Sequence, residues 1–490
     1  MVDCIIATVP RLHIRAPITG PAILKAVLQQ HNFSCSCVDW NIDLWHCVGV
    51  ELADWWNDTN VTFRYRTEFD KIYDIIEPHV KKWVQYIIQE NPTYFGMSLF
   101  SQRSLFMCEM ICKELKQHNT DIKIIIGGPY VNYCGDIFLK NKWCDFFIKG
   151  EGEEAIVALL NGDDHPGING TAPQIDDLDT IPTPDYSDYN FSIYSRKFLE
   201  PHIRDELGAT VIYITGSRGC VRRCTFCDII NQWPAFRYRS AESILNEMLT
   251  QYKVYGIKEF YFTDSLINGN VTQFTKLCEL LIEFYRQENI TPFECYSHFI
   301  CRPETQSPPD LFVKMSQAGF INLDIGIESI SPKVRRDMKK YFSNEDIFYT
   351  LEQCNKQKNI KVYLLMMVGY PAETEEDFLM TYNFFTNGFL GADQANHCNI
   401  GYLKNRNKVK VIVGPACDLL AGAPLYEDRH LWGIEFDKTD HWYTENNDIE
   451  VRINRYIRLQ KHLKKLGYEV LTKTLTHLEL ELERLQQLKI

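Results

Sequence analysis

The stretch TVIYITGSRGCVRRCTFCDI, residues 210–229, joins an apolar segment to a loop that contains three cysteines. Its first six residues are all β-branched or aromatic, which is typical of a buried strand. Cys220, Cys224 and Cys227 stand at positions i, i+4 and i+7, a spacing that one face of a helix would also give. The glycines and the polar residues around the cysteines favour a loop that leaves the end of the strand.

Three kinds of site could use these thiols. A zinc site needs four ligands, usually as two separated pairs, and the nearest histidine, His202, lies on a polar connector. A thioredoxin-like role for Cys224 and Cys227 would leave Cys220 unexplained. Three thiolates can instead hold a [4Fe–4S] cluster in which one iron stays open for another molecule. Arginines around the loop would offset the negative charge of a cluster, so the sequence favours this interpretation.

The segment 206–395 repeats a pattern of strand and helix. Six stretches are expected to form strands, at 210–217, 258–265, 293–300, 321–329, 361–369 and roughly 394–403. Helical periodicity separates them. Six β/α units in about 200 residues predict a partial TIM-type barrel, in which functional side chains follow the C-terminal ends of the strands.

Residues 1–160 also alternate strands with helices, and the expected fold class of the chain is α/β. The strands are expected at 4–10, 34–40, 94–100, 122–128 and 144–150. This pattern predicts a doubly wound, Rossmann-like parallel sheet that binds a ligand beyond the C-terminal ends of its strands. A polar linker spans 161–205. Residues 396–490 are expected to form a small mixed or helical region that closes the barrel.

Composition narrows the function classes. A net charge of −12 and a pI near 5.6 argue against nucleic acid as a partner. No signal peptide is visible, and no apolar run reaches the roughly 20 residues that span a bilayer. The 17 cysteines therefore indicate a cytoplasmic protein with reduced thiols, most of which are small core residues.

The pattern Cys-x₃-Cys-x-aromatic-Cys after a first barrel strand resembles the signature of the radical S-adenosylmethionine (SAM) enzymes. CVRRCTFC matches it at every defined position, and the resemblance covers roughly 205–395. It implies a [4Fe–4S] cluster on Cys220, Cys224 and Cys227, whose open iron binds the amino and carboxylate groups of SAM. An electron from a partner such as flavodoxin or ferredoxin would then cleave SAM to methionine and a 5′-deoxyadenosyl radical.

The resemblance also implies SAM contacts. Asp264 and Ser265 end the second strand, where the family holds the SAM amino group. Glu328 and Ser329 end the fourth strand, near the methionine or ribose part. The other implied contacts are Phe226 with a planar ligand, Arg302 with the SAM carboxylate, and Gly369 and Pro371 with adenosine. Structural roles compete with these, since Asp264 could cap a helix and Gly369 could only form a turn. Arg302 could equally be a solvated loop residue.

The N-terminal domain resembles that of the cobalamin (B12)-binding radical SAM subfamily. The segments IIIGGPYVN, CDFFIKGEGEEAI and IPTPDY follow the order seen there. The implied cobalamin contacts are Ser98, Gly127, Gly128, Pro129, Gly150, Glu151 and Gly152. The Asp-x-His-x-x-Gly sequence that supplies a cobalt ligand in many cobalamin domains is absent, and His13 is the only histidine close to the predicted rim. The domain would bind cobalamin without a histidine ligand, or serve as a lid or recognition module without cobalamin.

Together these features predict a cobalamin-dependent radical SAM enzyme that methylates an unactivated carbon. The substrate would be a small molecule or a peptide, and no charge pattern identifies it. A radical rearrangement, cyclisation or oxidation, with or without cobalamin, is the alternative reaction. A non-catalytic Fe–S or nucleotide-binding regulator is the alternative from another class, and the intact cysteine loop argues against it.

Overall fold

The computed structural model describes residues 2–56, 60–118, 121–195, 207–208, 210–387, 403, 405, 407–414, 417, 419–437, 441–470, 475, 478–479 and 482. The chain divides into two compact units. Met1–Ile214 with Asn246–Glu259 form the first, and Thr215–Leu245 with Phe260–Ile490 form the second.

The first unit is built on a parallel sheet with the strand order β2-β1-β3-β4-β5-β6. The strands are β1 (Cys4–Thr8), β2 (Cys35–Asp39), β3 (Tyr94–Ser98), β4 (Lys123–Gly127), β5 (Phe146–Lys149) and β6 (Gly170–Thr171). The pairing places Thr8, Ser98 and Gly127 side by side at the C-terminal edge of the sheet. Every residue of β1 is buried, as expected for a parallel strand between two layers of helices.

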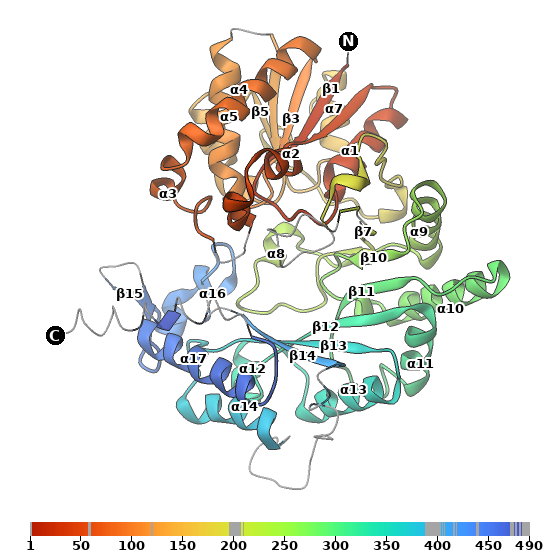
Figure 1. Ribbon diagram of the computed structural model, residues 1–490, viewed down its shortest axis with the longest axis vertical. Coiled ribbons are helices and arrows are strands. Elements are labelled where there is room, and N and C mark those ends of the chain that lie inside the picture. The colour runs from red at the N-terminus through yellow and green to blue at the C-terminus, as the bar shows by residue number, and fades with distance from the viewer. Residues whose placement is uncertain are drawn as a thin grey trace. The chain divides into compact units, whose positions relative to one another are not determined.

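Helices cover both faces of this sheet, with α4 and α5 on one side and α1 and α7 on the other (Figure 1). The helices are α1 (Thr19–Gln30), α2 (Trp40–Cys47), α3 (Arg66–Asp70), α4 (Tyr73–Glu90), α5 (Leu105–Gln117), α6 (Val131–Lys140) and α7 (Glu153–Asn161). Short 3-10 turns occur at Val50–Trp56, Gln102–Ser104, Leu178–Thr180 and Phe191–Ile193. This arrangement confirms the doubly wound, Rossmann-like region.

A second six-stranded sheet has the order β14-β13-β12-β11-β10-β7. Its strands are β7 (Val211–Ile214), β10 (Glu259–Phe262), β11 (Glu294–Phe299), β12 (Phe320–Glu328), β13 (Lys361–Met366) and β14 (Val409–Val413). The helices that alternate with them are α9 (Ala241–Tyr255), α10 (Val271–Glu288), α11 (Pro309–Ala318), α12 (Pro332–Asp337), α13 (Asn344–Lys356) and α14 (Glu375–Asn387). β11 to β14 pair in parallel, so the expected barrel class is confirmed.

The sixth strand lies later in the chain than the sequence predicted. The predicted stretch 394–403 falls outside the described residues, apart from Leu403. The strand that pairs with β13 is Val409–Val413, in which valines at alternate positions are buried. Two lysines in and beside this short strand hide the apolar pattern in the sequence, because alternation in only five residues is a weak signal.

The C-terminal region is mixed, as expected. It contains α16 (Pro424–Glu427), a 3-10 turn (Arg429–Trp432), β15 (Glu435–Phe436) paired with β16 (Trp442–Tyr443), and α17 (Ile449–Lys465). Leu475 is buried against Ile453 and Ile457 of α17, so the leucine-rich end of the chain contributes at least this packing contact.

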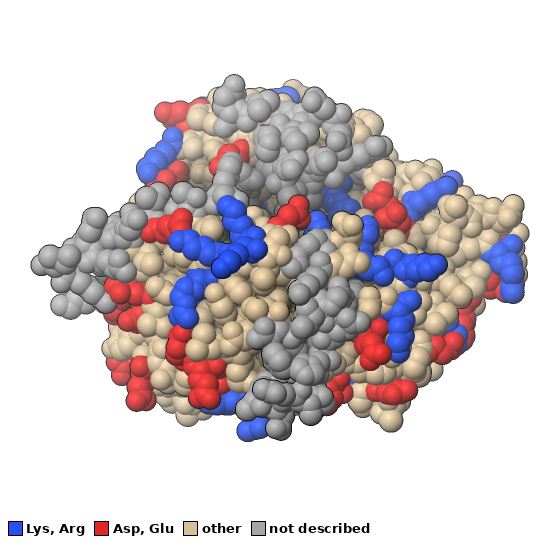
Figure 2. Space-filling view, turned by 60° about the horizontal axis from the view of Figure 1, so that its bottom comes forward, with Lys and Arg blue, Asp and Glu red and all other residues tan. Residues whose placement is uncertain are grey.

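Charged side chains are interspersed on the surface. The face drawn in Figure 2 shows basic and acidic residues close to one another, without a broad area of one sign among the described residues. None of the described helices has the length and apolar character needed to cross a membrane.

A buried ion pair joins α17 to the turn after β13. Glu373 Oε2 accepts a hydrogen bond from the Gly369 backbone N–H at 2.7 Å and lies 3.3 Å from Arg455 Nη1. Arg455 Nη1 also donates to Asn447 Oδ1 at 2.6 Å. Burial raises the pKa of Glu373 to about 7, because the loss of solvent outweighs the hydrogen bonds and the attraction of Arg455.

Removing this carboxylate is expected to weaken the pH dependence of stability. Between pH 4.5 and about 7 the folded protein binds a proton at Glu373 that the unfolded chain has lost, so stability falls as the pH rises. We expect Glu373→Gln to lose this contribution, which is on the order of 2 kcal/mol. Thermal unfolding followed by circular dichroism at about pH 5 and about pH 7.5 measures it.

The matched control is Glu375→Gln. Glu375 also pairs with Arg455, but half of its side chain is exposed, so the control is expected to keep the wild-type pH dependence. The same pH dependence in Glu373→Gln and in the wild type would contradict the role of Glu373.

Candidate functional site

The three cysteines lie on a loop, outside any helix, which excludes the helix-face alternative. A two-stranded ladder, β8 (Ser217–Arg218) against β9 (Arg237–Tyr238), closes the base of this loop. Gly219 follows β8 with a φ of +84°, and a Cβ there would lie 2.4 Å from the Ala235 carbonyl oxygen. Since only glycine accepts both conditions, Gly219 fixes where the loop leaves the ladder.

Thr225 anchors the loop to the rest of the second unit. Its backbone N–H donates to the Met338 carbonyl at 3.1 Å, and its carbonyl accepts from the Leu425 N–H at 2.7 Å. Its buried hydroxyl lies 2.9 Å from the Tyr370 hydroxyl. One residue therefore connects the loop to the end of α12, the turn after β13 and the C-terminal region.

The three thiols are partly buried, and basic residues surround them. Burial raises the pKa of each thiol, and that of Cys224 to about 12. The positive charge of Lys340 opposes this effect at all three cysteines. The Arg222 backbone N–H also donates to Cys220 Sγ at 3.3 Å. These groups favour the thiolate, which is the form that ligates a metal.

The donor set fits a cluster better than a single ion. Across the part of the chain that the structure describes, no three His, Cys, Asp or Glu side chains are gathered closely enough to hold one metal ion. A [4Fe–4S] cluster does not require such convergence, because each thiolate ligates its own iron. Three accessible thiols beside cationic groups are therefore suitable ligands for that cluster.

Lys340 is the main cation near the loop. Its Nζ donates to the Gly326 carbonyl oxygen and, at 2.8 Å, to Glu328 Oε1. The same Nζ lies 5.9 Å from the centre of the Phe226 ring. A Cβ on Gly326 would lie 2.6 Å from Lys340 Nζ, so the absence of a side chain at position 326 leaves room for the ammonium group.

Glu328 has a strained backbone at the end of β12. Its φ is +64°, in the region that favours glycine, and the register between β12 and β13 shifts at this point. The conformation directs the carboxylate to Lys340. Glu328 therefore lies beside the cysteine loop, and its SAM contact stays a prediction.

Asp264 is buried and supports the segment that enters the cysteine motif. Its Oδ2 accepts a hydrogen bond from the Gly216 backbone N–H at 2.9 Å. Burial raises the pKa of Asp264 to about 6. This structural hydrogen bond differs from the predicted contact with the SAM amino group, whereas the adjacent Ser265 is partly exposed.

Arg302 lies in the loop after β11, is partly buried, and is held close to the cysteine loop. Its Nη2 donates to the carbonyls of Asn268 at 3.0 Å and Gly269 at 3.4 Å. Burial lowers the pKa of Arg302, as does nearby Arg222, while Cys220 has the opposite effect. Its charge therefore acts on the region where the SAM carboxylate is expected.

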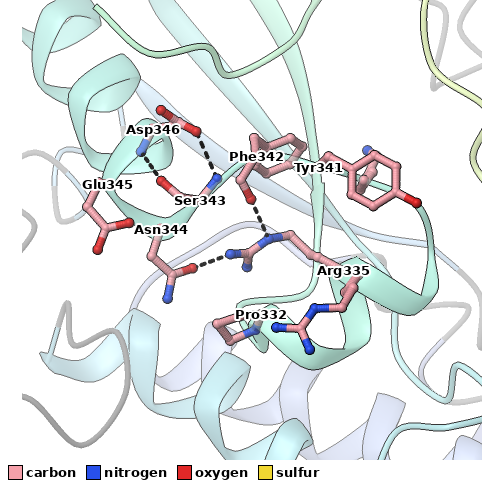
Figure 3. A pocket seen from close by; sticks show the side chains of 10 residues that line it. Pro332, Arg335, Tyr341, Phe342, Ser343, Asn344, Glu345 and Asp346 are labelled. Carbon is pink, nitrogen blue, oxygen red and sulfur yellow. Dashed lines mark hydrogen bonds between the residues drawn. The ribbon is translucent and has the colours of Figure 1, made fainter.

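Ser329 is fully buried, in contrast to its predicted contact with SAM. Its hydroxyl accepts from the Ser331 N–H at 3.2 Å, and its carbonyl accepts from Arg335 Nη1 at 2.6 Å. The buried Arg335 also donates to Asn344 and to the Phe342 carbonyl (Figure 3). Ser329 and Arg335 therefore hold the end of β12 in place, and the SAM contact of Ser329 stays a prediction.

A cavity of about 510 Å³ lies beside Arg335, and Figure 3 draws the side chains that line it. Its lining residues are Pro332, Arg335, Arg336, Lys340, Tyr341, Phe342, Ser343, Asn344, Glu345 and Asp346. None of the residues predicted to bind a cofactor lines this cavity, but Lys340 does, so the cavity borders the environment of the cysteine loop.

The turn at Gly369 and Pro371 contacts the C-terminal region. Gly369 has a φ of +75°, and a Cβ there would lie 2.5 Å from Arg452 Cγ. The Pro371 carbonyl accepts hydrogen bonds from Thr444 and Asn447 at 3.0 and 3.1 Å. Close packing of Arg452 from α17 therefore accounts for a glycine at position 369. The contact of Gly369 with adenosine stays a prediction.

The C-terminal edge of the first sheet has the features of a ligand site. At Gly127 a Cβ would meet no atom within 4 Å, so space is open above the strand. Gly128 has a φ of +101°, and a Cβ there would lie 2.8 Å from the Leu99 carbonyl oxygen. The hydroxyls of Thr8 and Ser104 are buried and have no hydrogen-bond partner. Unsatisfied hydroxyls at the C-terminal edge of the sheet suit a polar ligand, and the open space at Gly127 suits a bulky one.

The other residues of the predicted cobalamin rim have mixed environments. Pro129 is partly exposed, and Gly150 has a φ of +81°. Glu151 is buried and accepts from the Ile175 N–H at 2.7 Å, so its side chain holds the linker. Gly152 is the N-cap of α7. His13 Nδ1 lies 3.4 Å from the Tyr213 hydroxyl, which favours a packed histidine.

Several residues of the site carry no sequence signal. Thr225 and Lys340 are ordinary polar residues until the fold brings them to the cysteine loop. Gly326, between two isoleucines of a predicted strand, was a possible signal of a close approach. Thr8 was another, since it is a hydroxyl residue near the end of the strand predicted at 4–10.

Comparisons with known proteins agree with this architecture. Residues 214–385 match the radical SAM superfamily, and residues 66–160 match the B12 binding domain. These matches confirm the expected cofactors. The radical SAM domain implies a [4Fe–4S] cluster and SAM, and the B12-binding domain implies cobalamin.

The curated relatives are distant. An uncharacterized methyltransferase of Pyrococcus horikoshii is 24% identical over 60% of this chain and 64% of its own length. An anaerobic magnesium-protoporphyrin IX monomethyl ester cyclase of Synechocystis is 26% identical over 34% of this chain and 35% of its own length. The chain thus spans less than two thirds of either relative.

Solved structures share the fold over nearly the whole chain. The radical SAM methyltransferase TsrM of Kitasatospora setae, with tryptophan and a SAM analogue bound, has a TM-score of 0.64 at 14% identity and covers 95% of this chain and 89% of its own. The cobalamin-dependent SAM radical enzyme OxsB, with aqua-cobalamin bound, has a TM-score of 0.61 at 15% identity, over 98% of this chain and 71% of its own. Motif, fold and domain matches agree, and the chain therefore contains a radical SAM domain with a B12-binding domain ahead of it.

Proposed function

We propose that this protein is a cobalamin-dependent radical SAM enzyme that transfers a methyl group to an unactivated carbon. The cysteine loop, anchored through Thr225 beside the strand-end pair Glu328–Lys340, is the observation that carries this proposal. We assign residues 1–160 to the cobalamin domain, 161–205 to the linker, 206–395 to the radical SAM barrel and 396–490 to the region that closes it.

The chain's own residues hold and orient the cofactors. The bound cofactors would supply a 5′-deoxyadenosyl radical from SAM and a methyl group carried by cobalamin. Cys220, Cys224 and Cys227 would ligate the cluster, and Phe226 would pack against a planar part of SAM. Lys340 and Arg302 provide the positive charge that an anionic cluster and the SAM carboxylate need.

The rim of the first sheet is the proposed cobalamin site. The unpartnered hydroxyls of Thr8 and Ser104 can hydrogen-bond the polar edge of the ligand, and the open space at Gly127 admits its bulk. Ser98 lies between Thr8 and Gly127 in the register. No histidine is needed for this arrangement, which fits the packed position of His13.

The names of relatives favour methyl transfer. Both the relative from Pyrococcus horikoshii and TsrM are called methyltransferases. Cyclisation is the second candidate, because cyclases of the magnesium-protoporphyrin type also match part of the chain. A small electron-transfer protein such as flavodoxin or ferredoxin is the proposed reductant.

The cluster assignment and the enzyme proposal can be tested together. Anaerobically reconstituted protein is expected to show brown absorbance near ~400 nm and, once reduced, to release 5′-deoxyadenosine from SAM. Cys224→Ala is expected to lose both, since assembly needs its thiolate. The control Cys47→Ala removes an exposed cysteine of α2 and is expected to retain both.

Two outcomes would count against these assignments. A Cys224→Ala variant that kept its absorbance would contradict the cluster ligation. A cluster-loaded wild type that released no 5′-deoxyadenosine, even with candidate substrates, would contradict the radical enzyme. Cobalt analysis of the purified protein tests the B12 site separately.

Lys340→Met is expected to make the cluster harder to reduce. Reduction adds an electron, and the nearby ammonium stabilises that added charge, so its loss shifts the midpoint potential to more negative values. A redox titration followed by electron paramagnetic resonance measures the shift. The control is Lys339→Met, which removes the exposed neighbouring lysine. Equal midpoint potentials in Lys340→Met and wild type would exclude this role.

A further inference from the structure

One face of the second sheet lines the interior of the barrel, on the side away from α10, α11 and α13. Phe299, Leu323 and Leu364 point to the other face and are at most 1% exposed, because α10, α11 and α13 lie outside β11, β12 and β13 (Figure 1). Neighbouring positions such as His298 and Asp324 point the opposite way, and their side chains are 35% and 25% exposed. The interior of the barrel is therefore accessible at these two residues.

A row of polar side chains crosses this inner face. The strand register places His298 beside Asp324 and Asp324 beside Tyr363. His298 Nδ1 lies 4.0 Å from Asp324 Oδ2, and the Tyr261 hydroxyl donates to the same oxygen at 3.3 Å. The Tyr296 ring lies nearly parallel to that of Tyr261, with 6.2 Å between their centroids.

This row lies next to the site of the cofactors. Asp324 precedes Gly326 by two residues, so both lie on the same side of β12, about 7 Å apart along the strand. The Gly326 carbonyl binds Lys340, which is part of the cysteine-loop environment. A molecule in contact with Asp324 would therefore lie just below the SAM layer.

In the described structure no lysine or arginine pairs with the carboxylate of Asp324. The groups that act on Asp324 are His298 and Tyr261, and burial raises its pKa. Lys410, next in register beyond Tyr363, is 2.8 Å from Glu469 and so is already paired. A carboxylate beside the stacked rings of Tyr261 and Tyr296 is an environment that attracts organic cations.

We propose that Asp324, Tyr261 and Tyr296 form a substrate subsite that binds a protonated amine attached to a planar or apolar group. The carboxylate pairs with the ammonium, and the tyrosine rings contact the rest of the group. His298 borders the carboxylate and helps to orient it. This subsite rests on the proposed function, because it lies where a radical formed from SAM would meet a substrate.

Benzylammonium is a suitable probe, with benzyl alcohol and benzoate as its neutral and anionic analogues. On the cluster-loaded, full-length protein, ligand-observed NMR titrations are expected to show that benzylammonium binds about tenfold more tightly than either analogue. Asp324→Asn is expected to remove this preference, and Asp324→Glu to retain it. The control Glu352→Gln changes an exposed carboxylate on α13 and is expected to have no effect.

The SAM affinity of each variant shows whether the SAM site beside the cysteine loop remains folded. We expect this affinity to stay unchanged. The subsite is overturned if the wild type does not prefer benzylammonium, or if Asp324→Asn keeps that preference. A preference that depends on Asp324 in a protein that makes no 5′-deoxyadenosine would support the subsite and reject the radical enzyme. Formation of 5′-deoxyadenosine by a protein that does not prefer benzylammonium would support the radical enzyme and reject the subsite.

Discussion

The hydrogen bond between the hydroxyls of Thr225 and Tyr370 holds the cysteine loop to the barrel. A loop rich in thiols and arginines has little apolar surface of its own, so its position depends on such polar anchors. Both groups lie in a buried environment, where a lost partner costs about 1–3 kcal/mol. Tyr370 in turn belongs to the core that contains Leu425 and Trp442, so the C-terminal region also helps to position the cluster ligands.

The inner face of the second unit separates two kinds of charge. Arg302 adds positive charge to the layer at the strand ends, beside the cysteines, where Lys340 is paired with Glu328. One step down β12, Asp324 makes the next layer negative. An anionic cluster with the carboxylate of SAM suits the upper layer, and a cationic group suits the lower one. Opposite charges at neighbouring depths would keep cofactor and substrate from exchanging places.

Several contacts at the strand ends are structural where the motif alone suggested ligand binding. Gly369 is explained by Arg452, Asp264 by the Gly216 N–H, and Ser329 by its burial beside Arg335. Such residues can still fix the shape of the site, because they set where each strand ends. Their sequence positions identify the edge of the barrel but not which side chains face into it.

The sequence by itself determined the α/β class, the two successive series of strands and helices, and the loop with three thiols, because strand periodicity and cysteine spacing are local properties of the chain. It placed the sixth barrel strand too early, since Val409–Val413 is short and includes a lysine. Only the tertiary structure brought Lys340 to Glu328, Thr225 to Tyr370 and His298 to Asp324. The residues of each pair are 12 to 145 positions apart. Contacts over such separations are set by strand register and helix packing, which no local pattern specifies.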